Sequence, residues 1–370
     1  ADWLKGGPHL TMASLCRRFE EEFAAWLGRK HAIFCTSGSA ANWLMTMALK
    51  IWRPEIRTIK VPAIGWATTI SPALALGYKL EFLDAEPDTW SVWEWEAASS
   101  QEALIGVPVL GVPCVAGAGN GVYLEDACAA LGSASGDKKC GTFGTMASFS
   151  FYFAHQLSTI EGGMVVTDSP TLADLLRMLR AHGWAVDLEP ERAAAWWRDK
   201  GQGRWDFDRR FTFYVPGFNA RPTEMQGFLG LRQMQRIDQM VARRVANDRR
   251  YRKNLAGAEH LMIQKPAAGD QVCSIAIGVL ATSPEHRAKV ADALGPAGIE
   301  TRPIGGGNLA RQPFVHRRCG SCSMGFGGDQ AAQCPLADEI GRRGFQLPNG
   351  THLTEADIDM ICETVLKVKP

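Results

Sequence analysis

The sequence predicts an α/β fold, in which a large domain carries a mostly parallel mixed sheet and a smaller C-terminal domain is α+β. Short apolar and β-branched runs alternate with helical patterns through most of the chain, which favours a sheet covered by helices. The 370 residues are 46% hydrophobic and 21% charged, so the chain can bury a sizeable core. We expect the large domain to span residues 1–249 and the small domain residues 250–370.

The expected elements follow from these patterns in chain order. Pro170 stands just inside the start of a helix, where helices tolerate proline. Thr223 caps a long amphipathic stretch that we expect to link the two domains. We predict strands at 31–36, 57–61, 79–83, 104–109, 122–125, 146–151 and 164–167. We predict helices at 40–50, 170–181 and 223–249, followed by a strand at 272–279 and helices at 284–294 and 355–367.

Charge and hydropathy exclude several classes of protein. A net charge of +1 gives no electrostatic footprint for nucleic acid or for an acidic membrane surface. No apolar run reaches the roughly 18 residues of a membrane span, and the first residues lack a signal-peptide pattern. Ten scattered cysteines fit free thiols in a reducing compartment. We therefore expect a cytoplasmic protein without nucleic-acid or membrane partners.

The segment from Ser148 to Met164 carries the most informative residue of the chain. It reads S-F-S-F-Y-F-A-H-Q-L-S-T-I-E-G-G-M and resembles the active-site segment of the DegT/DnrJ/EryC1/StrS sugar-nucleotide aminotransferases, where an S-F-x-x-x-K-N-L-like run supplies the lysine that binds pyridoxal 5'-phosphate (PLP). His155 stands in the place of that lysine. An imidazole exchanges protons near neutral pH, its ordinary pKa being about 6.5, but forms no stable imine. Position 155 therefore keeps acid–base chemistry without the covalent anchor, and the resemblance makes Ser150 a cofactor contact.

The stretch from Thr36 to Asn42 is similar to the family's phosphate-binding turn. Its small residues lie between a predicted strand and a predicted helix, where backbone N–H groups at the positive end of the helix suit an anion. The resemblance assigns Gly38, Ser39 and Ala40 to the cofactor phosphate. Small residues before a helix also serve as a simple cap, and that alternative stays open.

Two more stretches are similar to those that hold the cofactor ring. Val61 to Thr69 places Trp66 where the family lays an aromatic ring against the pyridine, although a Trp in an apolar stretch is more often part of a core. Tyr123 to Gly132 is similar to the family's E-D-A-x-x-A-x-G, whose Asp pairs with the protonated ring nitrogen. Asp126 takes that position, and a helix cap is its plain alternative.

The last two stretches imply a shared site and a sugar-nucleotide pocket. Pro216 to Gln226 is similar to a segment whose Asn reaches the cofactor phosphate of a neighbouring subunit, so the resemblance gives that role to Asn219 and implies a homodimer with shared active sites. Gly298 to Phe314 is similar to the segment that faces the substrate. Arg302 and Asn308 are the expected contacts there, since a diphosphate suits a guanidinium and a sugar suits an amide, while a solvated loop is the alternative.

Together these stretches imply a PLP-dependent enzyme of fold type I, the aspartate aminotransferase-like fold. Within the family, a sequence with His in place of the Lys resembles the 3-dehydratase branch. That branch uses the pyridoxamine form (PMP), L-glutamate and a nucleoside-diphosphate 4-keto-6-deoxyhexose such as GDP-4-keto-6-deoxymannose, in deoxysugar biosynthesis for lipopolysaccharide O-antigen. Relatives with an iron–sulfur cluster carry a cysteine-rich loop after the His, but no cysteine lies between His155 and Asn219, so we expect no cluster. A plain sugar-nucleotide aminotransferase, or an inactive relative kept for binding or assembly, are the alternatives.

A cysteine pattern near the C-terminus adds a separate hypothesis. His316, Cys319, Cys322 and Cys334 read H-x2-C-x2-C-x11-C, and a C-x2-C pair can place two thiolates on one zinc ion. Free thiols are the stronger reading, because the spacing is loose. We therefore expect no metal, and keep structural zinc as a minor alternative.

Overall fold

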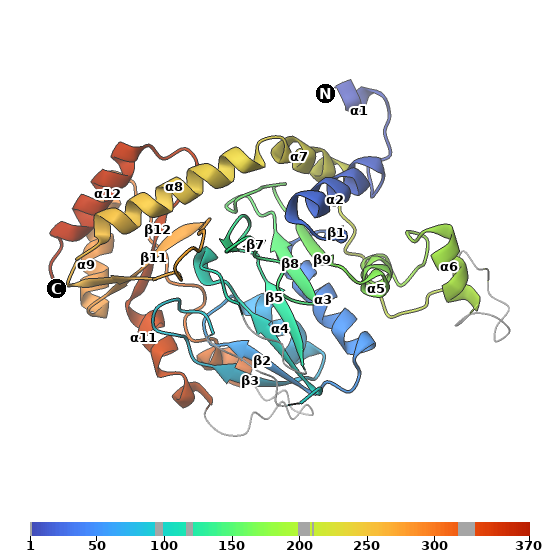
Figure 1. Cartoon of the computed structure of the whole chain (residues 1–370), viewed down its shortest axis with the longest axis horizontal. Helices are drawn as coiled ribbons and strands as arrows, with labels where there is room; N and C mark the ends of the chain where they lie inside the picture. Colours follow the sequence, from blue (N-terminus) through green and yellow to red (C-terminus); the bar gives the residue numbers. More distant parts are fainter. Residues whose placement is uncertain (1, 93–98, 116–120, 199–207, 209–210, 317–329) are drawn as a thin grey trace. The chain divides into compact units, whose positions relative to one another are not determined.

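The computed structural model describes residues 2–92, 99–115, 121–198, 208, 211–316 and 330–370 (Figure 1). Two compact units make up the chain, the first formed by Ala1–Pro54 with Thr145–Gln235 and the second by Glu55–Gly144 with Arg236–Pro370. The boundary expected after residue 249 falls inside a helix of the second unit and stays a prediction. Across the described part of the chain, no helix combines the length and apolar character needed to cross a membrane.

The first unit contains three antiparallel strands in the order β1-β9-β8, so β1 is an edge strand. The register pairs His31 with Thr167 between β1 and β9, and Met146 with Thr167 between β8 and β9. Its elements are α1 (Asp2–Lys5), α2 (Ser14–Leu27), β1 (His31–Cys35), α3 (Gly38–Trp52), β8 (Met146–Ser150), β9 (Gly163–Thr167), α5 (Pro170–Arg180), α6 (Pro190–Trp196) and α7 (Glu224–Met234).

Phenylalanines form the core where α2 packs on this part of the sheet. Phe19 and Phe23 of α2 are fully buried, and the Phe19 ring stands edge-on to Phe34 of β1 at 4.9 Å. Phe23 meets Phe149 and Phe151, at and just after the end of β8, with ring centroids 5.3 and 5.4 Å apart. Edge-to-face pairs of this kind add to the stability gained from burial alone. The core thus fixes the ends of the strands that lead to the predicted site.

Helix α7 lies against α2 and caps its first turn. The Glu224 carboxylate accepts hydrogen bonds from the backbone N–H groups of Ala13, Leu15 and Cys16 at 2.7, 2.9 and 2.9 Å. These N–H groups have no partner inside their own helix, so an acceptor from another helix satisfies them. Gly230 permits the close packing, because a Cβ there would lie 2.7 Å from the Phe19 ring.

The second unit contains four parallel strands in the order β5-β4-β2-β3, a three-stranded antiparallel sheet β10-β11-β12, and the β6-β7 pair. Thr58 of β2 pairs with Lys79 of β3 on one side and with Glu102 of β4 on the other. The strands are β2 (Thr58–Pro62), β3 (Lys79–Leu83), β4 (Glu102–Gly106), β5 (Val122–Asp126), β6 (Ala134–Ser135), β7 (Lys138–Lys139), β10 (Leu261–Ile263), β11 (Ala276–Ala281) and β12 (Gly344–Pro348). The helices are α4 (Ala67–Ala75), α8 (Ile237–Leu255), α9 (Pro284–Leu294), α10 (Pro313–His316), α11 (Pro335–Arg343) and α12 (Glu355–Lys367), with 3-10 turns at Val109–Gly111, Gly295–Ala297, Leu309–Arg311 and Gln330–Gln333.

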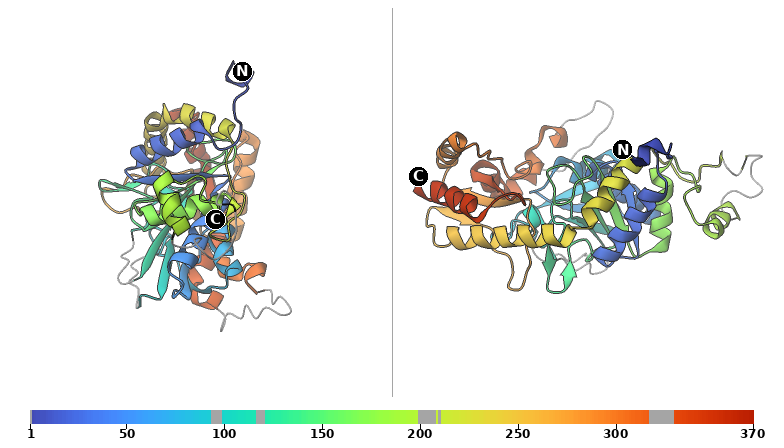
Figure 2. Two further views of the ribbon diagram at one scale, coloured as in Figure 1. Left: turned by 90° about the vertical axis from the view of Figure 1, so that its right-hand side faces the viewer. Right: turned by 90° about the horizontal axis from the view of Figure 1, so that it is seen from above.

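A separate core forms where α8, α9 and α12 meet β11 and β12 (Figure 2). Tyr251, Val279, Phe345 and Ile361 are at most 1% exposed in this cluster. At its edge, Arg250 of α8 pairs with Asp359 of α12 at 2.5 Å. This second core supports the C-terminal α+β part that the sequence predicts.

Most predicted elements are present, and the α/β class is confirmed. The strand predicted at 79–83 matches β3 residue for residue, and the other six predicted strands of the first half overlap β1, β2, β4, β5, β8 and β9. The single helix predicted at 223–249 was wrong. Arg236 leaves the helical region with φ −133° and ψ 16°, which separates α7 from α8. The strand predicted at 272–279 begins only at Ala276.

Candidate active site

Helix α3 begins directly after β1, and its first turn is the predicted phosphate turn. Ser37 is the N-cap, and its hydroxyl accepts a hydrogen bond from the Ala40 N–H at 3.1 Å. Gly38 is buried and Ser39 is exposed. Gly163 of β9 leaves room for the turn, because a Cβ there would lie 2.1 Å from the Ser37 carbonyl oxygen. The helix start is therefore capped and also offers the positive end and small residues that an anion needs.

His155 lies on a turn that follows β8. Its backbone N–H donates to the Tyr152 carbonyl at 3.0 Å, and its side chain is half-buried. The Tyr152 ring stands edge-on to the imidazole, with centroids 6.1 Å apart. Ser150, at the end of β8, accepts the Tyr152 N–H at 3.4 Å. The imidazole thus lies on a short hydrogen-bonded turn that a buried strand positions.

Strand β8 is tied to α3 by a contact that the sequence did not predict. The Ser148 hydroxyl donates to the Asn42 side-chain oxygen at 2.5 Å, and both residues are buried. The available signal was a polar Asn in a mostly apolar helix. The bond connects the strand before His155 to the helix that begins at the phosphate turn.

Asn219 is exposed and lies on an extended segment beside the end of α5. Ala181 and Asn219 form an antiparallel bridge. The Ala220 N–H donates to the Arg180 carbonyl at 2.9 Å, and the Thr36 N–H donates to the Ala220 carbonyl at 3.2 Å. Within the first unit, backbone hydrogen bonds therefore place the segment of Asn219 next to Thr36, the residue before the helix cap Ser37.

In the second unit, Asp126 lies at the end of β5 and is 6% exposed. The Thr69 hydroxyl donates to its Oδ2 at 2.6 Å, and the Cys128 N–H donates to its Oδ1 at 3.3 Å. Thr69 belongs to α4, whose N-cap is Trp66. Trp66 is 62% exposed, which excludes core packing within the described structure. Thr69 was missed from the sequence, since its partner is 57 positions away.

Two buried groups near the candidate residues are structural. Glu125 is fully buried and accepts the backbone N–H groups of Gly141 and Gly144 at 2.7 and 2.6 Å. Burial raises the pKa of Cys35, the last residue of β1, to about 12. Its neutral thiol donates to the Ser37 carbonyl at 3.4 Å. Glu125 therefore holds a loop, while the neighbouring Asp126 accepts hydrogen bonds from Thr69 and Cys128, and its role toward a ligand stays a prediction.

The predicted substrate residues differ in exposure. The Arg302 side chain is 63% exposed and pairs with Glu300 at 3.0 Å. Asn308 is 6% exposed, and its amide donates to Asp338 at 2.9 Å while its oxygen accepts the Ala310 N–H at 3.0 Å. Asn308 thus holds its own loop together, and its contact with a substrate stays a prediction.

The same loop is hydrogen-bonded to the turn that carries Trp66. The Gly306 N–H donates to the Gly65 carbonyl at 3.0 Å, and the Leu309 N–H donates to the Ala63 carbonyl at 2.8 Å. Gly305 has φ 51°, and a Cβ there would lie 2.5 Å from the Gly65 oxygen, so glycine is required. The second unit therefore brings the predicted ring-binding and substrate-binding stretches together.

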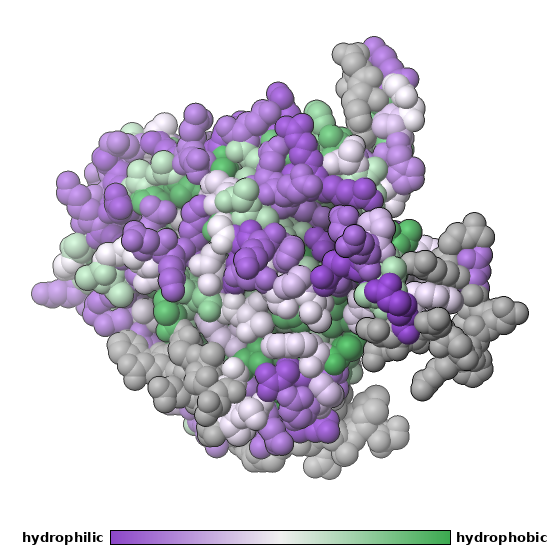
Figure 3. Space-filling view, turned by 45° about the vertical axis from the view of Figure 1, so that its right-hand side comes forward, coloured by the Kyte–Doolittle hydropathy of each residue, from purple (hydrophilic) through white to green (hydrophobic). Residues whose placement is uncertain are grey.

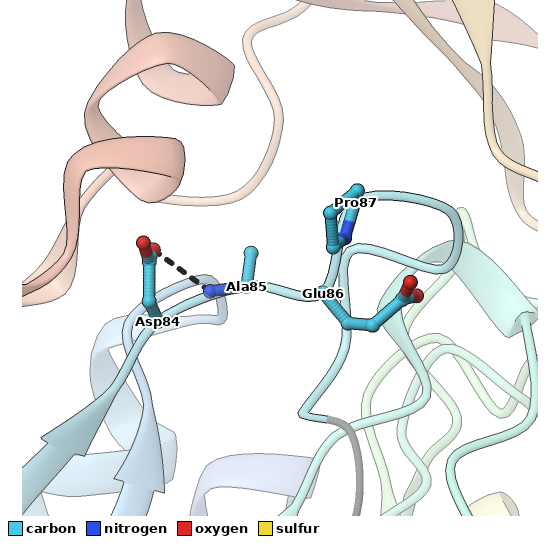
Figure 4. A pocket seen from close by; sticks show the side chains of 4 residues that line it. All are labelled: Asp84, Ala85, Glu86 and Pro87. Atoms are coloured by element: carbon cyan, nitrogen blue, oxygen red, sulfur yellow. Dashed lines mark hydrogen bonds between the residues drawn. The ribbon is translucent and has the colours of Figure 1, made fainter.

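A surface hollow of the second unit lies at the end of β3, lined by Asp84, Ala85, Glu86 and Pro87 (Figure 4). The Asp84 carboxylate accepts the Leu336 N–H at 3.0 Å, as well as those of Ala85 and Ala337, and so caps α11. None of the predicted site residues lines this hollow. We assign it a structural role.

The zinc hypothesis stays untested. Cys319 and Cys322 lie outside the described residues, and His316 ends α10. Cys334 is fully buried, and its burial, with Asp84 and Asp338 nearby, raises its pKa to about 12. Among the residues that the structure describes, no group of three or more His, Cys, Asp or Glu could hold a metal ion.

A family model described as the DegT/DnrJ/EryC1/StrS aminotransferase family matches residues 1–366. The chain belongs to this family. The GDP-4-keto-6-deoxy-D-mannose 3-dehydratase of Yersinia pseudotuberculosis is 32% identical over 321 residues, which cover 82% of this chain and 80% of that protein. The GDP-perosamine synthase of Caulobacter vibrioides is 29% identical over 363 residues, or 93% of this chain and 87% of the synthase.

Solved structures of the family share the fold. The Escherichia coli GDP-4-keto-6-deoxy-D-mannose 3-dehydratase with bound hydrated PLP has a TM-score of 0.82 and 26% identity, covering 98% of this chain and 95% of that one. Other structures of such a dehydratase, with the same TM-score, hold a trapped PLP–glutamate geminal diamine and, in a His-to-Asn variant, GDP-perosamine. The predicted PLP-enzyme fold is confirmed.

The residues present fit the cofactor of this PLP-dependent family of sugar-modifying enzymes. The start of α3 suits a phosphate, the buried Asp126 suits a protonated ring nitrogen, and the exposed indole of Trp66 suits a ring face. The turn after β8 carries His155 at the position where the resemblance to the family predicts a lysine. PLP is therefore the cofactor of this enzyme.

Proposed function

We propose that this enzyme removes the C3 hydroxyl from a nucleoside-diphosphate 4-keto-6-deoxyhexose. The observation that carries the proposal is His155 on the turn after β8, together with the retained Asp126, Trp66 and phosphate turn. Two proteins named GDP-4-keto-6-deoxy-D-mannose 3-dehydratase are 30% and 32% identical to the chain, each over 82% of its length. The similarity also favours GDP-4-keto-6-deoxymannose as the substrate.

His155 is the proposed acid–base group. Its imidazole takes up a proton and delivers one to the C3 hydroxyl as that group leaves. When bound, the cofactor supplies an electron sink in its pyridine ring. Asp126, oriented by the Thr69 hydroxyl, keeps the ring nitrogen protonated. Because an imidazole forms no stable imine, the aldehyde form of the cofactor would not be held in a covalent bond to the protein at position 155.

L-Glutamate is the proposed co-substrate, and the atoms of the net reaction balance. The C3 hydroxyl of the sugar leaves as water, one water supplies the keto oxygen of 2-oxoglutarate, and the nitrogen of glutamate leaves as ammonia. The sugar carbon is reduced and glutamate is oxidised, so no external reductant is needed. We therefore propose PMP as the working form, without an iron–sulfur cluster.

We propose a homodimer in which Asn219 serves the cofactor phosphate of the neighbouring subunit. Of the fifteen exposed large hydrophobic residues in the described structure, eleven belong to the first unit. Phe218, 52% exposed, adjoins Asn219, and Phe153, 64% exposed, lies two residues before His155. Figure 3 shows hydrophobic side chains at the surface of one face among hydrophilic ones. A second copy of the chain would bury such residues around both sites.

We also propose that the enzyme works in the cytoplasm, in deoxysugar biosynthesis for lipopolysaccharide O-antigen. The eight cysteines of the described residues are free thiols, and seven of them are buried, which suits a reducing compartment. The arrangement supports Arg302 as a contact for the substrate diphosphate, since its side chain is largely exposed.

A substrate panel tests the proposed reaction. We expect GDP-4-keto-6-deoxymannose, incubated with the enzyme, PLP and glutamate, to give a sugar nucleotide lighter by one oxygen in the mass spectrum. The CDP-linked 4-keto-6-deoxyglucose should react more slowly. A product in which the keto oxygen is replaced by an amino group would identify an aminotransferase instead.

A further inference from the structure

A buried arginine of the first unit lies behind the phosphate turn and takes no part in the proposed chemistry. Arg180 ends α5 and is 1% exposed. Its Nη1 donates to the Glu20 carboxylate at 2.5 Å and to the Phe34 carbonyl at 2.8 Å. Asp187 lies 3.6 Å from its Nη2. Burial alone would lower the pKa of Arg180, but Glu20 and Asp187 raise it, so the guanidinium stays charged.

The guanidinium and the Glu20 carboxylate form hydrogen bonds with the backbone at the outer edge of β1. Phe34 turns its N–H and C=O away from β9, since β1 is the edge strand. Glu20 accepts that N–H at 2.7 Å, and Arg180 donates to that C=O. Two residues further on, the Thr36 N–H at the same edge donates to Ala220. One ion pair and one backbone segment therefore fix β1 up to the residue before Ser37.

The backbone of Arg180 is hydrogen-bonded to the segment that contains Asn219. Its carbonyl accepts the Ala220 N–H at 2.9 Å, and the next residue, Ala181, bridges to Asn219. The side chain thus bonds to the strand that leads into the phosphate turn, while the main chain bonds to the segment that carries Asn219. Removing the side chain leaves Glu20 buried and the Phe34 carbonyl without this donor.

We propose that Arg180 is a positioning residue that holds both the phosphate turn and Asn219 of its own chain, so that the turn in one site and the Asn219 offered to the neighbouring subunit's site depend on one buried ion pair. The inference rests on the proposed function, because it takes the start of α3 and Asn219 as the phosphate ligands. Arg180 itself touches neither the cofactor nor the substrate. We therefore expect a substitution of Arg180 to weaken binding of the cofactor phosphate and to leave binding of the cofactor ring unchanged.

Comparing PLP with pyridoxal, which lacks the phosphate, separates positioning from general stability. We expect Arg180→Lys, which keeps the charge but loses the planar fork, to weaken PLP binding about tenfold and pyridoxal binding less than about twofold. The full chain is freed of cofactor by dialysis, and both dissociation constants are measured by fluorescence titration. Glu20→Gln should show the same selective loss, and it decides the matter if the lysine variant does not fold.

Arg29 provides the matched control at the opposite end of β1. Its side chain is only 6% exposed and pairs at 2.7 Å with Asp168, whose side chain is 48% exposed. We expect Arg29→Gln to lower the unfolding temperature without changing the ratio of the PLP and pyridoxal constants. An equal loss for both ligands in Arg180→Lys, or no loss in either, would overturn the inference. A wild-type chain that does not prefer PLP would instead contradict the proposed function, and the inference with it.

A double-mutant cycle tests the link to Asn219. If Arg180 positions Asn219, Asn219→Ala should cost less PLP affinity in the Arg180→Lys background than in the wild-type chain. In the Arg29→Gln background it should cost as much as in the wild type. Equal costs in all three backgrounds would show that Arg180 does not act on Asn219.

Discussion

Single residues decide which chemistry this fold can perform. His155 lies on a turn fixed by its own N–H bond to Tyr152, so a proton-transferring group stands where the family resemblance expects an anchoring amine. Asp126 is buried and bonded by Thr69, so its carboxylate is already oriented before a ligand arrives. Preorganised groups of this kind cost no rearrangement at the moment of reaction. The proposal therefore assigns the proton to His155 and the ring charge to Asp126.

Replacing His155 tests the acid–base assignment. We expect His155→Asn to keep the fold and PLP binding and to lose dehydration by roughly two to four orders of magnitude, the usual contribution of a general acid–base group. His155→Lys should form a covalent, borohydride-reducible bond to PLP and release little deoxygenated sugar. Ammonia release and the mass of the reduced protein are the readouts. Wild-type ammonia release by His155→Asn would remove the assignment.

Thr69 tests the orientation of Asp126. We expect Thr69→Val, which keeps the shape but loses the 2.6 Å hydrogen bond, to weaken PLP affinity by about three- to tenfold. Ser71→Ala is the control on the same helix, because its hydroxyl bonds only to the Ala67 carbonyl at 2.7 Å in the described contacts. Fluorescence titration with PLP compares the two variants. An unchanged affinity in Thr69→Val would mean that Asp126 needs no orienting bond.

At the scale of helices and strands, local patterns were predictable and long-range contacts were not. Strand β3 was placed residue for residue from its apolar pattern. The break between α7 and α8 was missed, because Gln235 and Arg236 carry no Gly or Pro signal. The phosphate turn, the His155 turn and the end of β5 were located through short motifs. Glu224, Thr69 and Arg180 were not assigned their contacts, since their partners lie 57 to more than 200 positions away.

The cap that joins α2 to α7 gives a pH-dependent prediction. Burial alone would raise the pKa of Glu224, but the N–H groups of Cys16, Leu15 and Ala13 hold it below its ordinary value of 4.5. A carboxyl whose pKa is lower in the folded state stabilises the fold above its ordinary pKa, and this stability is lost as the pH falls through the folded value. We therefore expect Glu224→Gln to lower the free energy of unfolding by about 1–3 kcal/mol at pH 7.

Urea unfolding at neutral and acidic pH measures the effect of that substitution. The difference between Glu224→Gln and the wild type should shrink steadily below about pH 4.5. Glu22→Gln on the same helix is the control, because the exposed pair of Glu22 with Arg18 at 2.8 Å should contribute less than about 1 kcal/mol. A difference that stays constant with pH would show that the Glu224 charge is not involved.

At the scale of the whole molecule, the proposal places each active site between two copies of the chain. The first unit holds the phosphate turn, His155 and Asn219, and it also carries most of the exposed large hydrophobic residues. The second unit holds Trp66 and Asp126. We propose that Asn219 serves the cofactor of the neighbouring subunit. Its exposure beside Phe218 is what supports the neighbour.

Mixing two inactive variants tests the shared site. In a heterodimer of His155→Asn with Asn219→Ala, one of the two sites regains both residues, so random exchange should restore about a quarter of all sites. Activity is measured after subunit exchange has been shown by mass spectrometry of the intact dimers. Exchange without recovery would mean that each site uses residues of one chain only.

The balance of ammonia against amino sugar tests the central claim most directly. The wild-type enzyme is incubated with GDP-4-keto-6-deoxymannose, PLP and L-glutamate, and ammonia, 2-oxoglutarate and the sugar products are quantified together. If His155 directs deoxygenation, ammonia, 2-oxoglutarate and the 3-deoxy sugar nucleotide should form in equal amounts, with no 4-amino sugar. Formation of a 4-amino sugar nucleotide with 2-oxoglutarate but without ammonia would contradict the account.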